Sequence, residues 1–512
     1  MGLPLQGTPI ILDIGSAYVK VGFAGEAGPR FVFPCITGTE KYKTVMVDID
    51  SGSRVYVGND AMKMRGVLKV AYPLQRGEIY DWDGFFEILN HIFYTLLRLE
   101  SLTDYPIIYT QHPFVPSETK QYIARLLFET HGVRSLIMME SPLLSNFSVG
   151  LITGLVIESG DGVTWISPII DGQIQYQATQ KLLLSGLDVN HNLKSLLMRE
   201  GINIESSATE EIIKEIKEKN CYFVLDAGKP PPMANTDNLT YPMPDGSIKE
   251  IPSHILYEAP EVMFQPSMLG YNLMNIPQAI IYSLQMVNSE HWADLLGHIV
   301  LSGGNLSYSG FETRLKQELN ILLPQLGPLP KSQKFSPVID EQASALRTVQ
   351  GKKKEQDNCP ECGTLVDISD EKTNCPTCGA DLNVSQVQIN LLGGSQDEAG
   401  KKLNTGVCPH CNKELQDRAS IFCPYCGKGL EIFDIPSKPK SFIPETSAEE
   451  FVEKSESEEI INFFIPDNLQ FAIFSGASIL GSLRSFQNLF ITYEQFQANP
   501  EIIFRDISEV FR

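Results

Sequence analysis

Short apolar runs that end at glycine-bearing turns recur along the first two thirds of the chain. Residues 10–14 form one such run, and after a turn that contains Gly15 and Ser16 a second run occupies 19–23. The same layout returns at 155–164, and the run 299–301 leads into Gly303 and Gly304. Apolar stretches of this length bounded by glycine turns are typical of buried strands, so the pattern predicts two hairpins and a third strand–turn element.

Helical spacing appears between these runs. Apolar residues occupy positions 85, 88, 89, 92, 93 and 96, which predicts an amphipathic helix. Ser207 and Glu210 fit a capping box that opens a further helix, which we expect to run through Glu218. Strands that alternate with helices predict an α/β fold.

The amino-acid composition changes in the last third of the chain. Residues 1–326 read as one continuous α/β body, whereas 327–459 are rich in Lys, Pro, Ser, Asn, Gly and Glu and end in an acidic run, which we interpret as a solvated linker. Apolar strand and helix patterns return over 460–512. We therefore expect 327–459 to be inserted into one domain, not appended to it.

The first two turns carry a chemistry suited to phosphate. Backbone N–H groups of a tight turn can point at one phosphate, and two such hairpins that face each other can hold a phosphate chain from both sides. Asp13 at the end of the first strand can hold Mg²⁺ through water, and Lys20 can add a positive charge. Taken alone, the first turn is more typical of an ordinary hairpin that carries a surface aspartate.

Several segments resemble actin and the actin-related proteins. The resembling segments are 72–77 (Tyr-Pro-Leu-Gln-Arg-Gly), 82–83, 217–219, 221–222, 264–267 and 301–304. The resemblance covers roughly residues 1–325 and 460–512. It implies an actin-like fold, in which two α/β domains surround a central cleft that binds ATP or ADP with a divalent cation such as Mg²⁺.

The resemblance also implies where the nucleotide binds. Asp13 matches the aspartate near the cation, Lys217 and Glu218 match the pair beside the adenosine, and Tyr308 belongs to the turn that faces adenine. The expected nucleotide-binding residues are Asp13, Gly15, Ser16, Lys20, Gly160, Asp161, Gly162, Lys214, Lys217, Glu218, Ser302, Gly303, Gly304 and Tyr308. Without the three turns, the cluster from Lys214 to Glu218 would be read as an i,i+4 surface pair.

The chain departs from the family where actin positions its attacking water with glutamine, aspartate and histidine. Ser141 stands at the glutamine position, Glu158 at the aspartate position and Trp165 at the histidine position. Tryptophan cannot relay a proton, and the neighbouring Glu140 is expected to point elsewhere. We therefore predict slow or absent ATP hydrolysis. Gln470 replaces a lysine beside the adenine, which predicts modestly weaker binding.

Eight of the ten cysteines form four Cys-x-x-Cys pairs inside the insert. Two pairs make one set at 359–378 and two make a second set at 408–426. The predicted ligands of two structural Zn²⁺ ions are Cys359, Cys362, Cys375, Cys378, Cys408, Cys411, Cys423 and Cys426. The insert resembles a double zinc ribbon, and an iron–sulfur cluster is the alternative. Cys35 and Cys221 lie outside the sets and are predicted to be buried thiols.

Charge and hydropathy restrict the classes of molecule that the protein can bind. The net charge is −21, from 41 basic and 62 acidic side chains, and acidic residues outnumber basic ones across 351–459. The ribbons are therefore predicted to bind protein partners, such as actin-like proteins or subunits of a complex, and not nucleic acid. No apolar run has the ~18 residues of a membrane span, and residues 1–9 show no signal-peptide pattern, so we expect a soluble protein inside the cell. The resemblance to actin implies a cytoplasmic, cytoskeletal location.

Three functions remain open at this stage. The leading hypothesis is a nucleotide-binding actin-related regulator or scaffold with little turnover, because in actin the loop that matches the insert lies near the longitudinal filament contact. The second is an actin-like ATPase that forms filaments despite its insert. The third is a small-molecule kinase of the same superfold, which the actin-like segments disfavour.

Overall fold

The computed structural model describes residues 7–41, 54–204, 209–225, 238–243, 246–327, 356–358, 365–367 and 460–505. The chain divides into two compact units, 1–351 with 455–512 and 352–454. In the second unit the described residues form β18 (Gln356–Asn358) and β19 (Leu365–Asp367), which pair antiparallel. The eight paired cysteines, the acidic run and the start of the helix expected at Ser207 lie outside the described residues. The domain limits expected from the sequence stay predictions.

One six-stranded sheet organises the first half of the larger unit. Its order is β21 (Ile491–Thr492), β10 (Ser135–Glu140), β9 (Ile107–Gln111), β1 (Ile10–Ile14), β2 (Tyr18–Phe23) and β3 (Phe31–Pro34). Strands β1 and β2 form the antiparallel hairpin predicted from the apolar runs, and β1 is parallel to β9, which is parallel to β10.

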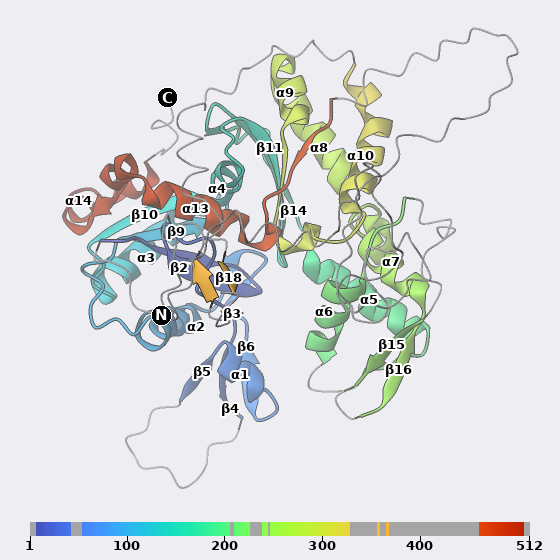
Figure 1. The fold of residues 1–512 in the computed structure, drawn as a ribbon, viewed down its shortest axis with the longest axis horizontal. Helices are drawn as coiled ribbons and strands as arrows, with labels where there is room; N and C mark the ends of the chain where they lie inside the picture. Colours follow the sequence, from blue (N-terminus) through green and yellow to red (C-terminus); the bar gives the residue numbers. More distant parts are fainter. Residues whose placement is uncertain are drawn as a thin grey trace, which may run out of the picture. The chain divides into compact units, whose positions relative to one another are not determined.

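A second sheet repeats this arrangement (Figure 1). Its order is β13 (Gln173–Ile174), β12 (Thr164–Ile170), β11 (Gly154–Ser159), β17 (Ile299–Ser302) and β20 (Phe463–Phe464), and β14 (Gln180–Leu182) pairs with β12. Again an antiparallel hairpin, β11–β12, is followed by two parallel neighbours. Residues after 460 thus return to the sheet that 154–302 began. The predicted α/β fold is confirmed.

Two helices carry the chain from one sheet to the other. Helix α4 (Ser141–Ser148) leads from β10 to β11, and α13 (Ala472–Ser482) leads from β20 towards β21. They pack through Leu144, Phe474 and neighbouring apolar side chains. Gly476 lets the backbones approach closely, because a Cβ atom there would lie 1.9 Å from the Leu144 carbonyl oxygen.

The other described helices also belong to the larger unit. The helix expected over 85–96 is present as α2 (Trp82–Asn90), which continues as the π-helix η1 (His91–Leu96). Within the described residues, the other α-helices are α1 (Asn59–Lys63), α3 (Ser117–Arg125), α5 (Gly186–Arg199), α6 (Thr209–Asn220), α7 (Ser253–Glu261), α8 (Ile276–Gln285), α9 (Trp292–Gly297), α10 (Phe311–Leu322) and α14 (Tyr493–Ala498). None of the described helices combines the length and the apolar character that crossing a bilayer requires.

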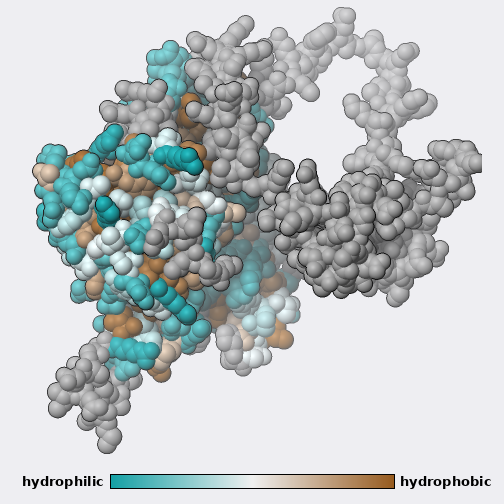
Figure 2. Space-filling model, turned by 60° about the vertical axis from the view of Figure 1, so that its left-hand side comes forward, coloured by the Kyte–Doolittle hydropathy of each residue, from teal (hydrophilic) through white to brown (hydrophobic). Residues whose placement is uncertain are grey.

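Small sheets complete the larger unit. They are formed by β4 (Thr37–Glu40), β5 (Val55–Val57) and β6 (Leu68–Ala71), by β7 (Leu74–Gln75) and β8 (Glu78–Ile79), and by β15 (Leu239–Pro242) and β16 (Ile248–Ile251). On the face shown in Figure 2, hydrophobic residues are interspersed among hydrophilic ones. Cys35 and Cys221 are buried free thiols, as predicted, and burial raises the pKa of each to about 12.

Candidate functional site: a cavity between the two sheets

A cavity of about 320 Å³ lies where the carboxyl ends of strands from both sheets meet. Asp13 lies one residue before the end of β1, Gln111 ends β9 and Ser141 follows β10, all from the first sheet. Glu158 in β11 and Gly303 after β17 come from the second sheet. The parallel strands therefore collect polar groups from distant parts of the sequence into one place.

The predicted nucleotide-binding residues converge on this cavity. All of them line it except Ser302, which is fully buried and accepts a hydrogen bond from the Ser145 hydroxyl at 2.9 Å. The three departures Ser141, Glu158 and Trp165 also line the cavity. Nucleotide binding by these residues stays a prediction at this point.

The two hairpin turns face each other. A Cβ atom on Gly162 would lie 2.7 Å from the Ser16 hydroxyl oxygen, so only glycine permits this approach. Gly160 also lines the cavity, and a Cβ atom there would meet nothing within 4 Å. Because Gly160 and Gly162 have no side chains, the backbone of this turn leaves room for a group as bulky as a phosphate.

Asp13 and Asp161 bring carboxylates to the cavity from the two opposed hairpins. Asp13 is 5% exposed and accepts hydrogen bonds from Lys20 Nζ at 2.8 Å and from the Thr110 hydroxyl at 3.0 Å. Asp161 projects from the opposite turn and is a quarter exposed. Because Mg²⁺ prefers one or two carboxylates together with substrate phosphates and water, these two side chains fit such an ion.

Helix α6 contributes cations to the cavity. Lys217 is 5% exposed, its Nζ donates to the Gly186 carbonyl at 3.1 Å, and it lies 3.9 Å from Asp161. Burial lowers the pKa of Lys217, and Asp161 opposes this shift. Lys214 Nζ lies 3.8 Å from the centre of the Tyr18 ring. The cavity wall thus holds positive charge that an anionic ligand would neutralise.

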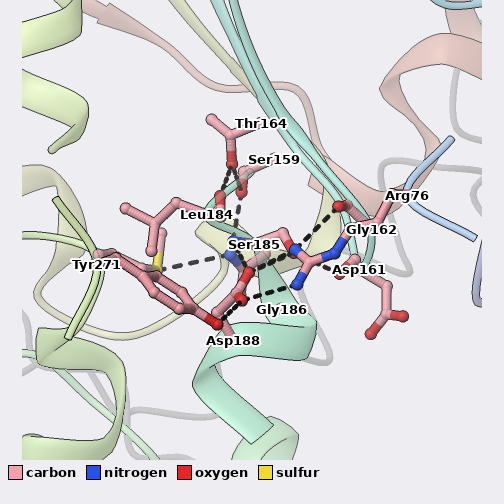
Figure 3. A network of polar contacts seen from close by, with 12 residues as sticks. Arg76, Ser159, Asp161, Gly162, Thr164, Leu184, Ser185, Gly186, Asp188 and Tyr271 are labelled. Carbon is pink, nitrogen blue, oxygen red and sulfur yellow. Dashed lines mark hydrogen bonds and ion pairs between the residues drawn. The ribbon is translucent and has the colours of Figure 1, made fainter. Parts of the chain in front are cut away.

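An ion pair joins the two halves beside the cavity (Figure 3). Arg76, between β7 and β8, binds Asp188 of α5 through both guanidinium Nη atoms, at 2.6 and 2.8 Å. Asp188 is fully buried and also accepts from the backbone of Ser185 at 2.8 Å and from the Tyr271 hydroxyl at 3.3 Å. The hydrogen bond to Asp188 raises the pKa of Arg76. Two parallel charge-assisted bonds fix orientation as well as distance.

Three buried polar atoms at the cavity have no hydrogen-bond partner among the described residues. They are Glu158 Oε2, Gln111 Oε1 and Trp165 Nε1. Buried polar atoms are normally paired, because leaving them unpaired costs about 1–3 kcal/mol each. Their convergence on one cavity fits a polar ligand, with its water, at this site.

Some residues of the site could not be found by motif matching. Gln111 and His112 line the cavity but belong neither to the three turns nor to a segment that resembles actin, whereas Arg76 lies in the resembling segment 72–77 without a role having been assigned to it. The signal available for Gln111 and His112 was their position directly after an apolar strand. Glu140, which the sequence placed next to the departures, does not line the cavity, since its carboxylate accepts from the Tyr176 hydroxyl and lies 3.7 Å from Lys120 Nζ.

Comparison with protein families agrees with this architecture. The family model described as double zinc ribbon matches residues 359–427, the segment that holds the paired cysteines. The family model described as actin matches residues 5–344, which is more than half of the chain. The predicted resemblance is confirmed, and the chain belongs to the actin family.

Proposed function

We propose that this protein binds ATP or ADP with Mg²⁺ in the cavity between its two sheets, hydrolyses ATP slowly, and acts as a regulator of actin-like filaments or as a scaffold within a complex. The double zinc ribbon serves as its surface for protein partners. The observation that carries the proposal is the pair of opposed glycine turns flanked by Asp13, Asp161 and Lys217.

The charges support a metal–nucleotide ligand. Gly160 leaves open backbone for a phosphate, and the buried Lys217 supplies a positive charge nearby. Asp13 and Asp161 offer oxygen ligands for Mg²⁺, which would neutralise phosphate charge when bound. Gly303 allows the turn after β17 to pack on the Ser159 backbone, where a Cβ atom would lie 2.2 Å from the carbonyl oxygen.

Slow turnover follows from the altered water-binding positions. The Ser141 side chain is shorter than glutamine, and Trp165 is 3% exposed with a ring that cannot transfer a proton. Hydrolysis requires a water held within hydrogen-bond reach of a base and aligned with the phosphorus. A site with these side chains supports nucleotide binding better than rapid hydrolysis.

The insert supports a role in complexes. A Zn²⁺ site closed by four thiolates leaves no open position for catalysis, so we assign the ribbons to recognition and not to chemistry. Metal binding also supplies folding energy that a short module lacks. We place the protein with cytoskeletal partners in the cytoplasm on the strength of its family.

Nucleotide binding is tested by thermal denaturation of the full chain with Mg-ATP, Mg-ADP or magnesium alone. We expect both nucleotides, but not magnesium, to raise the melting temperature of the wild type. Lys217→Met should remove most of this shift. Lys219→Met is the matched control on the same helix, because Lys219 is exposed, pairs with Glu215 and does not line the cavity. An unchanged melting temperature with saturating nucleotide would overturn the proposal.

Sedimentation separates the regulator from a filament-forming ATPase. Purified protein with Mg-ATP should stay in the supernatant if it regulates other filaments or joins a complex. Robust pelleting, sensitive to nucleotide, would instead favour the filament-forming alternative.

A further inference from the structure

His112 brings an imidazole to the cavity from a strand end that the motifs did not indicate. It follows β9 directly, and its ring lines the cavity with 26% of the side chain exposed. Its Nδ1 lies 3.4 Å from the Ser141 hydroxyl oxygen and 3.6 Å from Glu158 Oε1. The ring therefore stands beside two of the three positions at which the chain departs from actin.

The third departure holds this ring in place. The ring centroids of Trp165 and His112 lie 6.0 Å apart with planes inclined by 28°. Phe114 packs on Trp165 at 6.0 Å, and Lys181 Nζ lies 5.6 Å from the indole. The imidazole is also close to Gly77, where a Cβ atom would lie 3.0 Å from His112 Cδ2. Tryptophan thus supports an imidazole that reaches the cavity from the neighbouring sheet.

The spacing of the polar atoms around His112 suits a bridging water molecule. Separations of 3.4 and 3.6 Å exceed those of strong hydrogen bonds, so neither Ser141 nor Glu158 fully engages Nδ1. Glu158 is 4% exposed, and its Oε2 has no partner among the described residues. A water that donates to both Glu158 and His112 Nδ1 would satisfy both groups.

We infer that His112, with Glu158 and Ser141, forms a relocated water-activating group that carries the slow hydrolysis of ATP by this protein. The inference rests on the proposed nucleotide binding. The neutral ring, with its hydrogen on Nε2, accepts a hydrogen bond from the water at Nδ1. Glu158 orients the same water and stabilises the imidazolium that forms, as a carboxylate beside a histidine base does.

The proposed step balances without a further reactant. The oxygen of the water forms a bond to the terminal phosphorus, and the bond between that phosphorus and the bridging oxygen breaks. The electron pair of the broken bond stays on the terminal β-phosphate oxygen of ADP. The proton of the water passes to His112 Nδ1 and leaves to solvent through the exposed part of the ring.

Single-turnover hydrolysis of bound ATP by the full-length protein tests the inference. We expect His112→Ala to slow phosphate release about a hundredfold, the usual contribution of a positioned base, with the Kd for ATP changed by less than about twofold. Added imidazole should restore part of the rate to this variant. His254→Ala is the control, because His254 pairs with Glu200 and does not line the cavity.

Binding of a transition-state analogue gives a readout that does not depend on turnover. The wild type should bind ADP with aluminium fluoride more tightly than ADP alone, because the analogue mimics the phosphoryl group under attack by water. His112→Ala should lose this preference and keep its affinity for ADP. If the variant retains both the preference and the wild-type rate, the inference is wrong while nucleotide binding stands. If the wild type binds neither ATP nor ADP, the proposed function itself fails.

Discussion

Replacing Gly476 by alanine tests the packing that joins the two halves of the molecule. Gly476 lies within α13, where alanine is favoured over glycine by about 1 kcal/mol in helix propensity. Local sequence therefore predicts that Gly476→Ala is stabilising. The structure predicts the reverse, because the new Cβ atom would lie 1.9 Å from the Leu144 carbonyl oxygen of α4.

The size of the effect follows from the distance. Ordinary contacts of a Cβ atom begin near 3.4 Å, so α4 and α13 must separate by about 3.4 − 1.9 = 1.5 Å. The obstructing atoms belong to backbone, and no side-chain rotation relieves the overlap. Overpacking of this kind costs about 1–3 kcal/mol and occasionally more. Because the overlap is with backbone, the cost lies at the upper end of this range, so after subtracting the gain in propensity we expect a net loss of about 2 kcal/mol in the free energy of unfolding.

Urea denaturation of the full chain measures this loss. Gly297→Ala is the matched control, because Gly297 also lies in a helix and a Cβ atom there meets only the Ile460 carbonyl oxygen, at 3.8 Å. The control should be neutral or slightly stabilising. Because α4 begins at the cavity residue Ser141, Gly476→Ala should also weaken nucleotide binding. Wild-type stability and affinity in Gly476→Ala would refute the reasoning.

Three further predictions concern other parts of the molecule. Arg76→Met leaves Asp188 buried without its cation, which should lower the free energy of unfolding by about 3 kcal/mol and weaken nucleotide binding. A variant as stable as the wild type would contradict a structural role for this ion pair. Burial lowers the pKa of His131 to about 4, so the folded state binds a proton there less readily than the unfolded state does. The stability of the protein should therefore fall as the pH is lowered from 6.5 to 4. Melting curves of His131→Gln should show a smaller fall over this range. Metal analysis should find about two zinc ions per chain, and about one in Cys375→Ser; less than one in the wild type would exclude the ribbons.

Much of the framework could be predicted from local patterns. The hairpins β1–β2 and β11–β12 were visible because each pairs residues that are close in sequence across a glycine turn. The helix over 85–96 was visible because its buried side chains repeat at helical spacing. The resemblance then identified thirteen nucleotide-binding residues that line the cavity, all of those expected except Ser302.

The tertiary structure decided which distant groups meet. Arg76 and Asp188 are 112 positions apart, and nothing in either neighbourhood indicates that they pair. His112 gains its significance only because β9 is parallel to β1 and β10, so that their carboxyl ends open into one cavity opposite Glu158. At position 476, helix propensity favours alanine, whereas the packing of α13 against α4 requires glycine. Periodicity and turn chemistry act between neighbours along the chain, whereas these contacts depend on how two whole sheets and their connecting helices pack.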